Sequence, residues 1–91
     1  MYHVLLTVDP GETHFRAVEA LEDCALPLLA EYGAERLFCL RHVDGSGETQ
    51  LYAFPSEEVF DRYRQDPRWI AARHRPELAG LRTMARPVAM I

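Results

Sequence analysis

Four side chains of this sequence carry groups that could act on a small molecule: His3, Thr7, Arg41 and Tyr52. An imidazole has a pKa of about 6.5 and therefore exchanges a proton readily near neutral pH. We predict that His3 is the general acid or base of a reaction that moves a proton next to a carbonyl group. Thr7, Arg41 and Tyr52 are predicted to bind the ligand, with Arg41 or Tyr52 as the polarising group. The alternative for His3 is a histidine packed in an interface or placed at a frayed terminus.

Further candidates for binding an anion are Arg73 and Arg75, since guanidinium groups hold carboxylates by two parallel hydrogen bonds. Solvated surface arginines are the alternative. His42 and Asp44 are two residues apart, so on a strand they would share a face and the carboxylate could orient the imidazole. Because Gly45 follows, the alternative is that Asp44 serves a turn.

The four histidines lie far apart in the chain, and no two have the i, i+4 spacing with which one helix face binds an ion. We predict no metal site and no other cofactor. His14 and His74 are expected to be exposed. Cys24 and Cys39 are too far apart for a redox or zinc motif, and we expect both to be buried, reduced thiols.

Length and composition exclude several function classes. The 91 residues predict a single domain, 1–91, and 48% hydrophobic with 26% charged residues is typical of a globular chain. The net charge is −4, and no basic stripe is present, so we expect no binding to nucleic acid. All ten basic residues are arginine, which excludes Schiff-base chemistry on a lysine.

The sequence also predicts where the protein acts. No apolar run approaches the ~20 residues of a membrane span, so no membrane partner is expected. Residues 1–6 lack the basic region and cleavage signal of a secretory leader. We therefore expect a cytoplasmic protein.

The candidate residues must be positioned by four strands and three helices. Apolar and β-branched runs predict strands at 2–8, 35–43, 49–54 and 81–90. Apolar residues at spacings of three and four predict a helix over 12–32, which Gly33 ends. Shorter helices are expected at 56–65 and 67–75, capped by Ser56 and by Asp66 with Pro67 in the first turn.

The element order β-α-β-β-α-β is that of the ferredoxin-like α+β fold. It predicts an antiparallel four-stranded sheet in the order 4-1-3-2 with the helices on one face. Pro87 would then lie on an edge strand. If Val4, Leu6 and Val8 face the helices, the open face carries the other residues of the first strand: His3, Leu5, Thr7 and Asp9. Such a partly apolar face predicts a symmetric homodimer, with a cavity either between sheet and helices or between two sheets.

Several segments are similar to those of the dimeric α+β barrel superfamily, and within it the chain resembles the DUF1330 family of unknown function. These segments are Ala25 to Gly33 (a helix interrupted by Pro27), Tyr52 to Ser56, Val59 to Arg64, and Asp66 to Trp69. The resemblance covers nearly the whole chain and implies the fold and the dimer. The superfamily includes cofactor-independent monooxygenases, muconolactone isomerases, polyketide cyclases and haem enzymes.

Two functional hypotheses follow. The first is a protein that binds or transforms a small apolar, aromatic or keto-acid molecule without a cofactor, with a monooxygenase-, isomerase- or cyclase-like reaction. The second is a non-catalytic dimeric module whose open sheet face serves only association. Phe54, Tyr52, Tyr63 and Trp69 are expected to belong to the core rather than to stack on a cofactor.

Overall fold

The strand predicted at 2–8 forms the middle of the sheet as β1 (Tyr2–Asp9). The computed structural model describes residues 1–11 and 15–91, so the predicted start of the first helix and the exposure of His14 lie outside the described residues. The elements that follow β1 are α1 (Phe15–Glu31), β2 (Glu35–Arg41), β3 (Glu48–Phe54), α2 (Glu57–Arg64), α3 (Pro67–Arg73), a 3-10 turn η1 (Pro76–Leu78) and β4 (Arg82–Val88).

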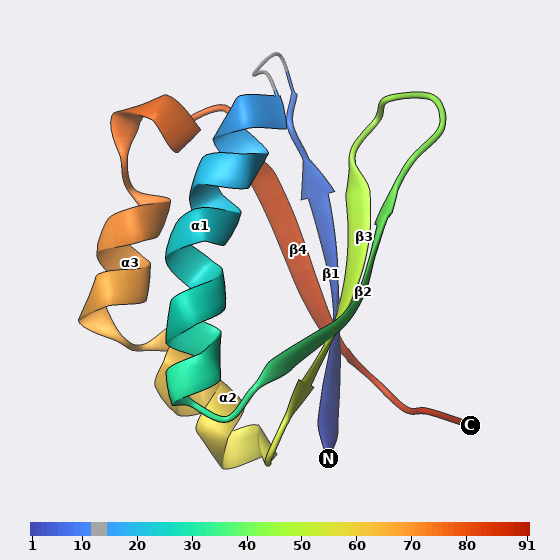
Figure 1. Ribbon diagram of the computed structural model, residues 1–91, viewed down its shortest axis with the longest axis vertical. Coiled ribbons are helices and arrows are strands. Elements are labelled where there is room, and N and C mark those ends of the chain that lie inside the picture. Colours follow the sequence, from blue (N-terminus) through green and yellow to red (C-terminus); the bar gives the residue numbers. More distant parts are fainter. Residues whose placement is uncertain (12–14) are drawn as a thin grey trace.

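The four strands form one antiparallel sheet in the order β2-β3-β1-β4, and the helices cover one of its faces (Figure 1). This topology confirms the predicted ferredoxin-like α+β fold. β4 lies at an edge of the sheet, where it pairs with β1, and this confirms the position expected of Pro87. Edge strands tolerate proline because one side of their backbone needs no partner in the sheet.

The alternation in β1 divides its side chains between the two faces of the sheet. Val4 and Val8 are buried, and Val4 packs in the core with Leu28 and Phe60. His3, Leu5 and Thr7 point to the opposite face, which no helix covers (Figure 1). We call this second side the open face. The strand register also places on it Phe38 and Leu40 of β2, Thr49, Leu51 and Ala53 of β3, and Met84, Arg86 and Val88 of β4.

The short helices begin at the predicted caps. Ser56 Oγ accepts a hydrogen bond from the Val59 amide at 3.2 Å, and Asp66 Oδ1 accepts one from the Arg68 amide at 2.8 Å. These caps satisfy amides that have no partner within the first helical turn. α1 runs through Pro27 to Glu31, and Gly33 follows it with a φ of 70°.

Aromatic rings from β3 and the helices fill the core below the sheet. The Phe54 ring lies 4.9 Å from that of Phe60 and 5.6 Å from that of Tyr63, and Tyr63 stacks on Trp69 at 5.3 Å. Tyr52, Phe54 and Tyr63 are buried and Trp69 is half-buried, so the expected core role of these four rings is confirmed.

The expected burial of both cysteines is wrong. Cys39 is exposed because β2 is an edge strand whose residues are nearly all accessible. Cys24 is half-buried on α1, where Arg75 Nη1 donates to its sulfur at 3.2 Å. Both thiols are free.

Among residues 1–11 and 15–91, none of the helices has the combined length and apolar character that crossing a bilayer requires.

Candidate functional site

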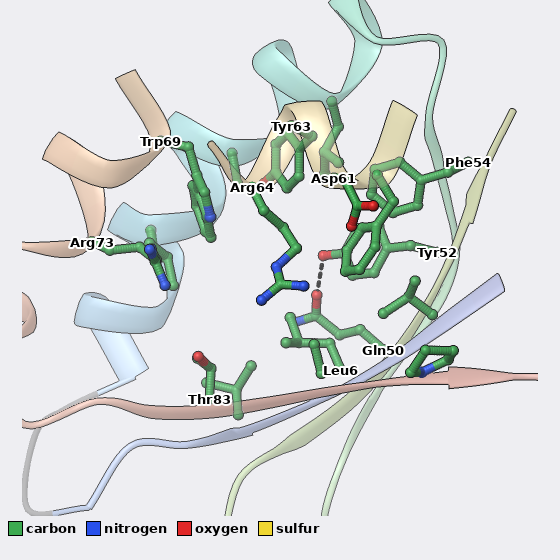
Figure 2. A pocket seen from close by; sticks show the side chains of 18 of the residues that line it. Leu6, Gln50, Tyr52, Phe54, Asp61, Tyr63, Arg64, Trp69, Arg73 and Thr83 are labelled. Atoms are coloured by element: carbon green, nitrogen blue, oxygen red, sulfur yellow. Dashed lines mark hydrogen bonds between the residues drawn. The ribbon is translucent and has the colours of Figure 1, made fainter. Parts of the chain in front are cut away.

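A cavity of about 690 Å³ lies between the helix-covered face of the sheet and the helices (Figure 2). β1 contributes the side chains that alternate toward the helices, and α1, α2 and β3 supply most of the remaining wall. The apolar part of the lining consists of Val4, Leu6, Val8, Val18, Leu21, Ala25, Leu29, Phe54, Phe60, Trp69, Ala85 and Pro87. Pockets of this size and composition are typical of small-molecule sites in proteins.

One wall of the cavity is polar, and it is built on β3. Gln50 and Tyr52 are two residues apart and therefore face the helices together. The Tyr52 hydroxyl donates a hydrogen bond to Gln50 Oε1 (Figure 2). Gln50 Nε2 donates to Glu22 Oε1 at 3.1 Å and to Glu48 Oε1 at 3.0 Å. Gln50 is 1% exposed, so these bonds satisfy an amide that has lost its contact with water.

The network continues from Glu48 into β2. Arg41 donates to Glu48 Oε2 from Nε at 3.1 Å and from Nη2 at 2.7 Å, and the Cys39 thiol donates to Glu48 Oε1 at 3.3 Å. Arg36 Nη1 lies 3.2 Å from Glu22 Oε2. α1, β2 and β3 thus bring two carboxylates and two guanidinium groups together at this wall of the cavity.

The two carboxylates differ in their affinity for a proton. Burial and the hydrogen bond with Glu48 raise the pKa of Glu22, against the opposing effect of Arg36. Burial alone would raise the pKa of Glu48 as well, but the hydrogen bonds from Arg41 and Cys39 lower it. Of the two carboxylates, Glu22 therefore has the higher affinity for a proton, and it is the member that lines the cavity.

The same groups set the protonation of Tyr52 and Cys39. Burial raises the pKa of Tyr52 to about 12, so its hydroxyl keeps its proton at neutral pH. Although the Cys39 side chain is accessible, partial desolvation of its sulfur and, second, its hydrogen bond to Glu48 raise the pKa of Cys39 to about 11. Neither group is an anion under ordinary conditions.

Glu22, Cys39 and Glu48 bring three possible metal ligands within 4.8 Å of one another. Both carboxylates are already paired with guanidinium groups, from Arg36 and Arg41. Two positive charges at this distance oppose a cation, and the Cys39 thiol holds its proton. The arrangement therefore favours the hydrogen-bond network over an ion.

Two arginines of the helices, Arg64 and Arg73, also line the cavity. The Arg64 guanidinium carbon lies 5.3 Å from the centre of the Phe60 ring, and that of Arg73 lies 5.7 Å from the centre of the Trp69 ring. Both side chains extend toward the cavity (Figure 2). Within the described part of the chain, neither guanidinium forms an ion pair.

The structure divides the four predicted site residues between different places. Tyr52 lines the cavity, and Arg41 lies behind it, bound to Glu48 with its guanidinium 3.9 Å from the centre of the Phe15 ring. His3 and Thr7 lie on the open face, so the sheet separates them from Tyr52 in the same subunit. The catalytic role of His3 and the binding roles stay predictions.

The other histidine, aspartate and arginine candidates form local contacts outside the cavity. His42 contacts Ser46 Oγ at 3.0 Å and Thr49 Oγ1 at 2.7 Å, while Asp44 accepts a hydrogen bond from the Ser46 amide at 2.9 Å in the turn. Asp44 is therefore the turn residue of the alternative interpretation. His74 is exposed, as expected, and Arg75 pairs with Glu77 at 3.2 Å.

Sequence analysis missed Glu22, Gln50 and Arg64. The sequence did contain a signal for the polar wall on β3. Alternate positions of this strand carry polar groups, where an apolar face toward the core would be expected: Glu48, Gln50 and Tyr52. Glu22 and Arg64 lie on helices among other charged residues, and their spacing carried no comparable signal.

No family model matches the chain, and no curated protein is similar to it. Its fold is similar to that of an uncharacterised NIPSNAP domain protein from Burkholderia xenovorans, with a TM-score of 0.67 and 14% identity over 98% of this chain and 94% of that one. A protein of unknown function from Rhodopseudomonas palustris has a TM-score of 0.68 and 14% identity, over 99% of this chain and 83% of that one. At these identities the likeness establishes the ferredoxin-like α+β fold alone.

Proposed function

We propose that this protein binds a small aromatic or keto-acid molecule in the cavity between sheet and helices, and that it works as a homodimer. The cavity carries this proposal: about 690 Å³ of space has apolar walls, a buried polar wall at Gln50 and Tyr52, and charged residues of α2 and α3 in its lining. Sites for small organic molecules combine these two features, since apolar contact supplies affinity and a few fixed polar groups orient the ligand.

We propose further that any reaction in this cavity needs no cofactor and is isomerase-, cyclase- or monooxygenase-like. A proton transfer fits the cavity best, because Glu22 lines it and burial raises the pKa of Glu22. A raised pKa brings a carboxyl group closer to the range in which it can exchange a proton with a ligand.

The homodimer is proposed on the strength of the open face. Phe38, Leu40 and Met84 lie there and are 39%, 58% and 58% exposed. Association of two such faces would bury them, and it would place His3 and Thr7 between subunits. We also propose membership of the DUF1330 family, supported by the proline, serine and aromatic residues quoted above, and a cytoplasmic location, with which two free cysteines agree.

The exposed apolar side chains of the open face also favour a second candidate, a non-catalytic dimeric module. In that function the open face serves association, and His3 packs in the interface. The cavity would then be a gap in the core with no ligand of its own.

Ligand binding distinguishes the two. We expect phenylpyruvate and 4-methylbenzoate to shift the amide NMR signals of β1, β3 and α1 in a saturable way. Leu6→Trp, which fills the cavity, should abolish these shifts. Ile70→Trp adds the same ring on the exposed surface of α3 and should leave them unchanged. A folded dimer whose cavity signals respond to neither compound would support the module instead.

A further inference from the structure

We infer that the cavity selects a phenolic carboxylate over a keto acid, because the Tyr52 hydroxyl on its buried wall accepts a hydrogen bond and two of its lining arginines form no ion pair within the described residues. The inference rests on the proposed function and names the class of ligand for the same cavity. It follows from the direction of the hydrogen bonds around Gln50, from the position of Tyr52 and from the two arginines of the helices.

The first step is the orientation of the Gln50 amide. Its Nε2 lies 3.1 Å from Glu22 Oε1 and 3.0 Å from Glu48 Oε1. Rotating the amide by half a turn would bring its carbonyl oxygen against two carboxylate oxygens and lose both bonds. Two acidic neighbours therefore fix the amide nitrogen toward the interior of the network and the amide oxygen toward Tyr52.

The second step concerns the Tyr52 hydroxyl. A tyrosine hydroxyl has one proton, and here it is donated to Gln50 Oε1 (Figure 2). The high pKa of Tyr52 keeps that proton in place. The oxygen that meets a ligand can then only accept a hydrogen bond, so the ligand must bring the proton. A phenol does so, whereas a ketone presents a second acceptor to the same oxygen.

The neighbours of Tyr52 leave this argument intact. Arg36 lies opposite Tyr52 in the sheet, and its charge and its side-chain hydrogen bond with Tyr52 counteract the rise in the pKa of Tyr52. A guanidinium only donates, so the Tyr52 oxygen is an acceptor in this contact too. Its guanidinium is held by Glu22 at 3.2 Å, and Arg36 does not line the cavity. On the cavity side, Tyr52 therefore presents an acceptor.

The third step concerns the two arginines that line the cavity. Arg64 and Arg73 each lie over an aromatic ring and extend toward the cavity, and within residues 1–11 and 15–91 neither has an acidic partner (Figure 2). Glu57 and Asp61 of α2 line the same cavity, so its lining carries both signs of charge and a ligand carboxylate must lie beside the arginines. A carboxylate is the ligand group that a guanidinium binds best, through paired hydrogen bonds.

The apolar part of the cavity suits the aromatic ring of a ligand. Leu6, Phe54 and Phe60 line it and offer flat apolar contact. A ligand with a hydroxyl at one end of an aromatic ring and a carboxylate at the other would satisfy Tyr52 and the arginines together. 4-Hydroxybenzoate and 4-hydroxyphenylacetate represent this class at two lengths.

The test compares isosteric ligands by calorimetry and NMR titration. 4-Hydroxybenzoate and 4-hydroxyphenylacetate should bind about tenfold more tightly than their 4-methyl counterparts, which corresponds to one net hydrogen bond. 4-Formylbenzoate, whose carbonyl oxygen faces the Tyr52 acceptor, should bind more weakly than 4-methylbenzoate.

Two variants test the residues that make these contacts. Tyr52→Phe removes the acceptor and should bring the hydroxyl and methyl compounds to equal affinity without weakening the methyl compound. Arg64→Gln should weaken all carboxylates, and Arg62→Gln on the same helix, outside the cavity lining, is its control.

The outcomes separate this inference from the proposed function. Equal affinities for hydroxyl and methyl compounds in the unaltered protein, or a preference for the formyl compound, would overturn the phenolic inference and leave the cavity as a ligand site. Absence of binding by every compound would overturn the proposed function along with it. Should Tyr52→Phe fail to fold, the hydroxyl, methyl and formyl comparison in the unaltered protein decides the question alone.

Discussion

Asp66 joins three parts of the fold through one carboxylate. It caps α3 by accepting from the Arg68 amide, pairs with the Arg68 guanidinium at 3.0 Å, and accepts from the Tyr32 hydroxyl at 2.7 Å. These hydrogen bonds, those of Arg68 and Tyr32 first, hold the pKa of Asp66 far below its usual range. We expect Asp66→Asn to lower the melting temperature at pH 7 by several degrees, because an amide still caps but loses the charge. Thermal unfolding followed by circular dichroism measures it.

The pH dependence of this variant follows from the sign of the shift. A carboxyl whose pKa is lowered by folding stabilises the fold above its unfolded pKa, which is about 3.9, and the stabilisation is lost as pH falls toward the folded value. The difference between wild type and Asp66→Asn should therefore be constant from pH 7 to pH 5 and shrink below pH 4. Asp61→Asn, an exposed acid of α2, serves as control. A difference that grows in acid would contradict the assignment.

Cys39 offers a second test at the residue scale. Its pKa of about 11 means that few thiolates are present at pH 8, although its side chain is accessible. We expect alkylation of Cys39 by iodoacetamide to be roughly tenfold or more slower in the folded protein than in urea, since the thiolate is the reactive form. Mass spectrometry of the Cys39 peptide separates its labelling from that of Cys24. Equal rates in the two conditions would show that Glu48 does not hold the thiol.

At the scale of elements, the boundaries were predictable because proline, glycine and capping residues mark them. Ser56 and the Asp66-Pro67 pair begin helices where expected. The faces to which the side chains of β2 point were not predictable in this way. A register shift between Arg36 and Phe38 reverses its alternation, so Arg36 faces the helices with Tyr52 while Phe38 faces outward with Leu51. A bulge of this kind has no distinct residue pattern, and alternation alone therefore could not orient the strand.

The turn between β2 and β3 provides the prediction for this scale. Gly47 has a φ of 145°, and a Cβ there would lie 2.0 Å from the Val8 carbonyl oxygen of β1. Gly45 has a φ of 77° with open space around it. We expect Gly47→Ala to lower the free energy of unfolding by about 3 kcal/mol or more, since strain and a backbone clash combine. Gly45→Ala, which meets strain alone, should cost about 1 kcal/mol. Urea denaturation compares them, and equal losses would contradict the clash.

For the molecule as a whole, the division of the sheet into two faces explains which part of the site the sequence could predict. The alternation of β1 correctly assigned His3 and Thr7 to the open face. Tyr52 was also identified, but its neighbour Gln50 acquires meaning only when α1 brings Glu22 beside it, 28 residues away in the chain. Helix packing of this kind depends on the whole core, so no local pattern contains it.

The open face leads to the prediction for the assembled protein. Leu40 of β2 is 58% exposed there, beside other apolar side chains. If two copies associate through these faces, a charge at this position must be buried without a partner, which costs more than the contact gains. We therefore expect wild type to behave as a dimer and Leu40→Asp as a monomer in sedimentation velocity, with at least a tenfold weaker association at micromolar concentration.

Two further variants make this experiment specific to the open face. Phe38→Asp alters a second side chain of that face, and Ile70→Asp alters one on α3; their exposures are nearly the same, 39% and 38%. Association through the open face predicts a monomer for the first and an unchanged dimer for the second. Because His3 lies on the same face, His3→Ala should weaken association if the histidine packs in the interface. It should leave association unchanged if the histidine is free for the chemistry predicted for it. If wild type is a monomer, the proposed homodimer is contradicted. The open face would then be a contact surface for a different protein.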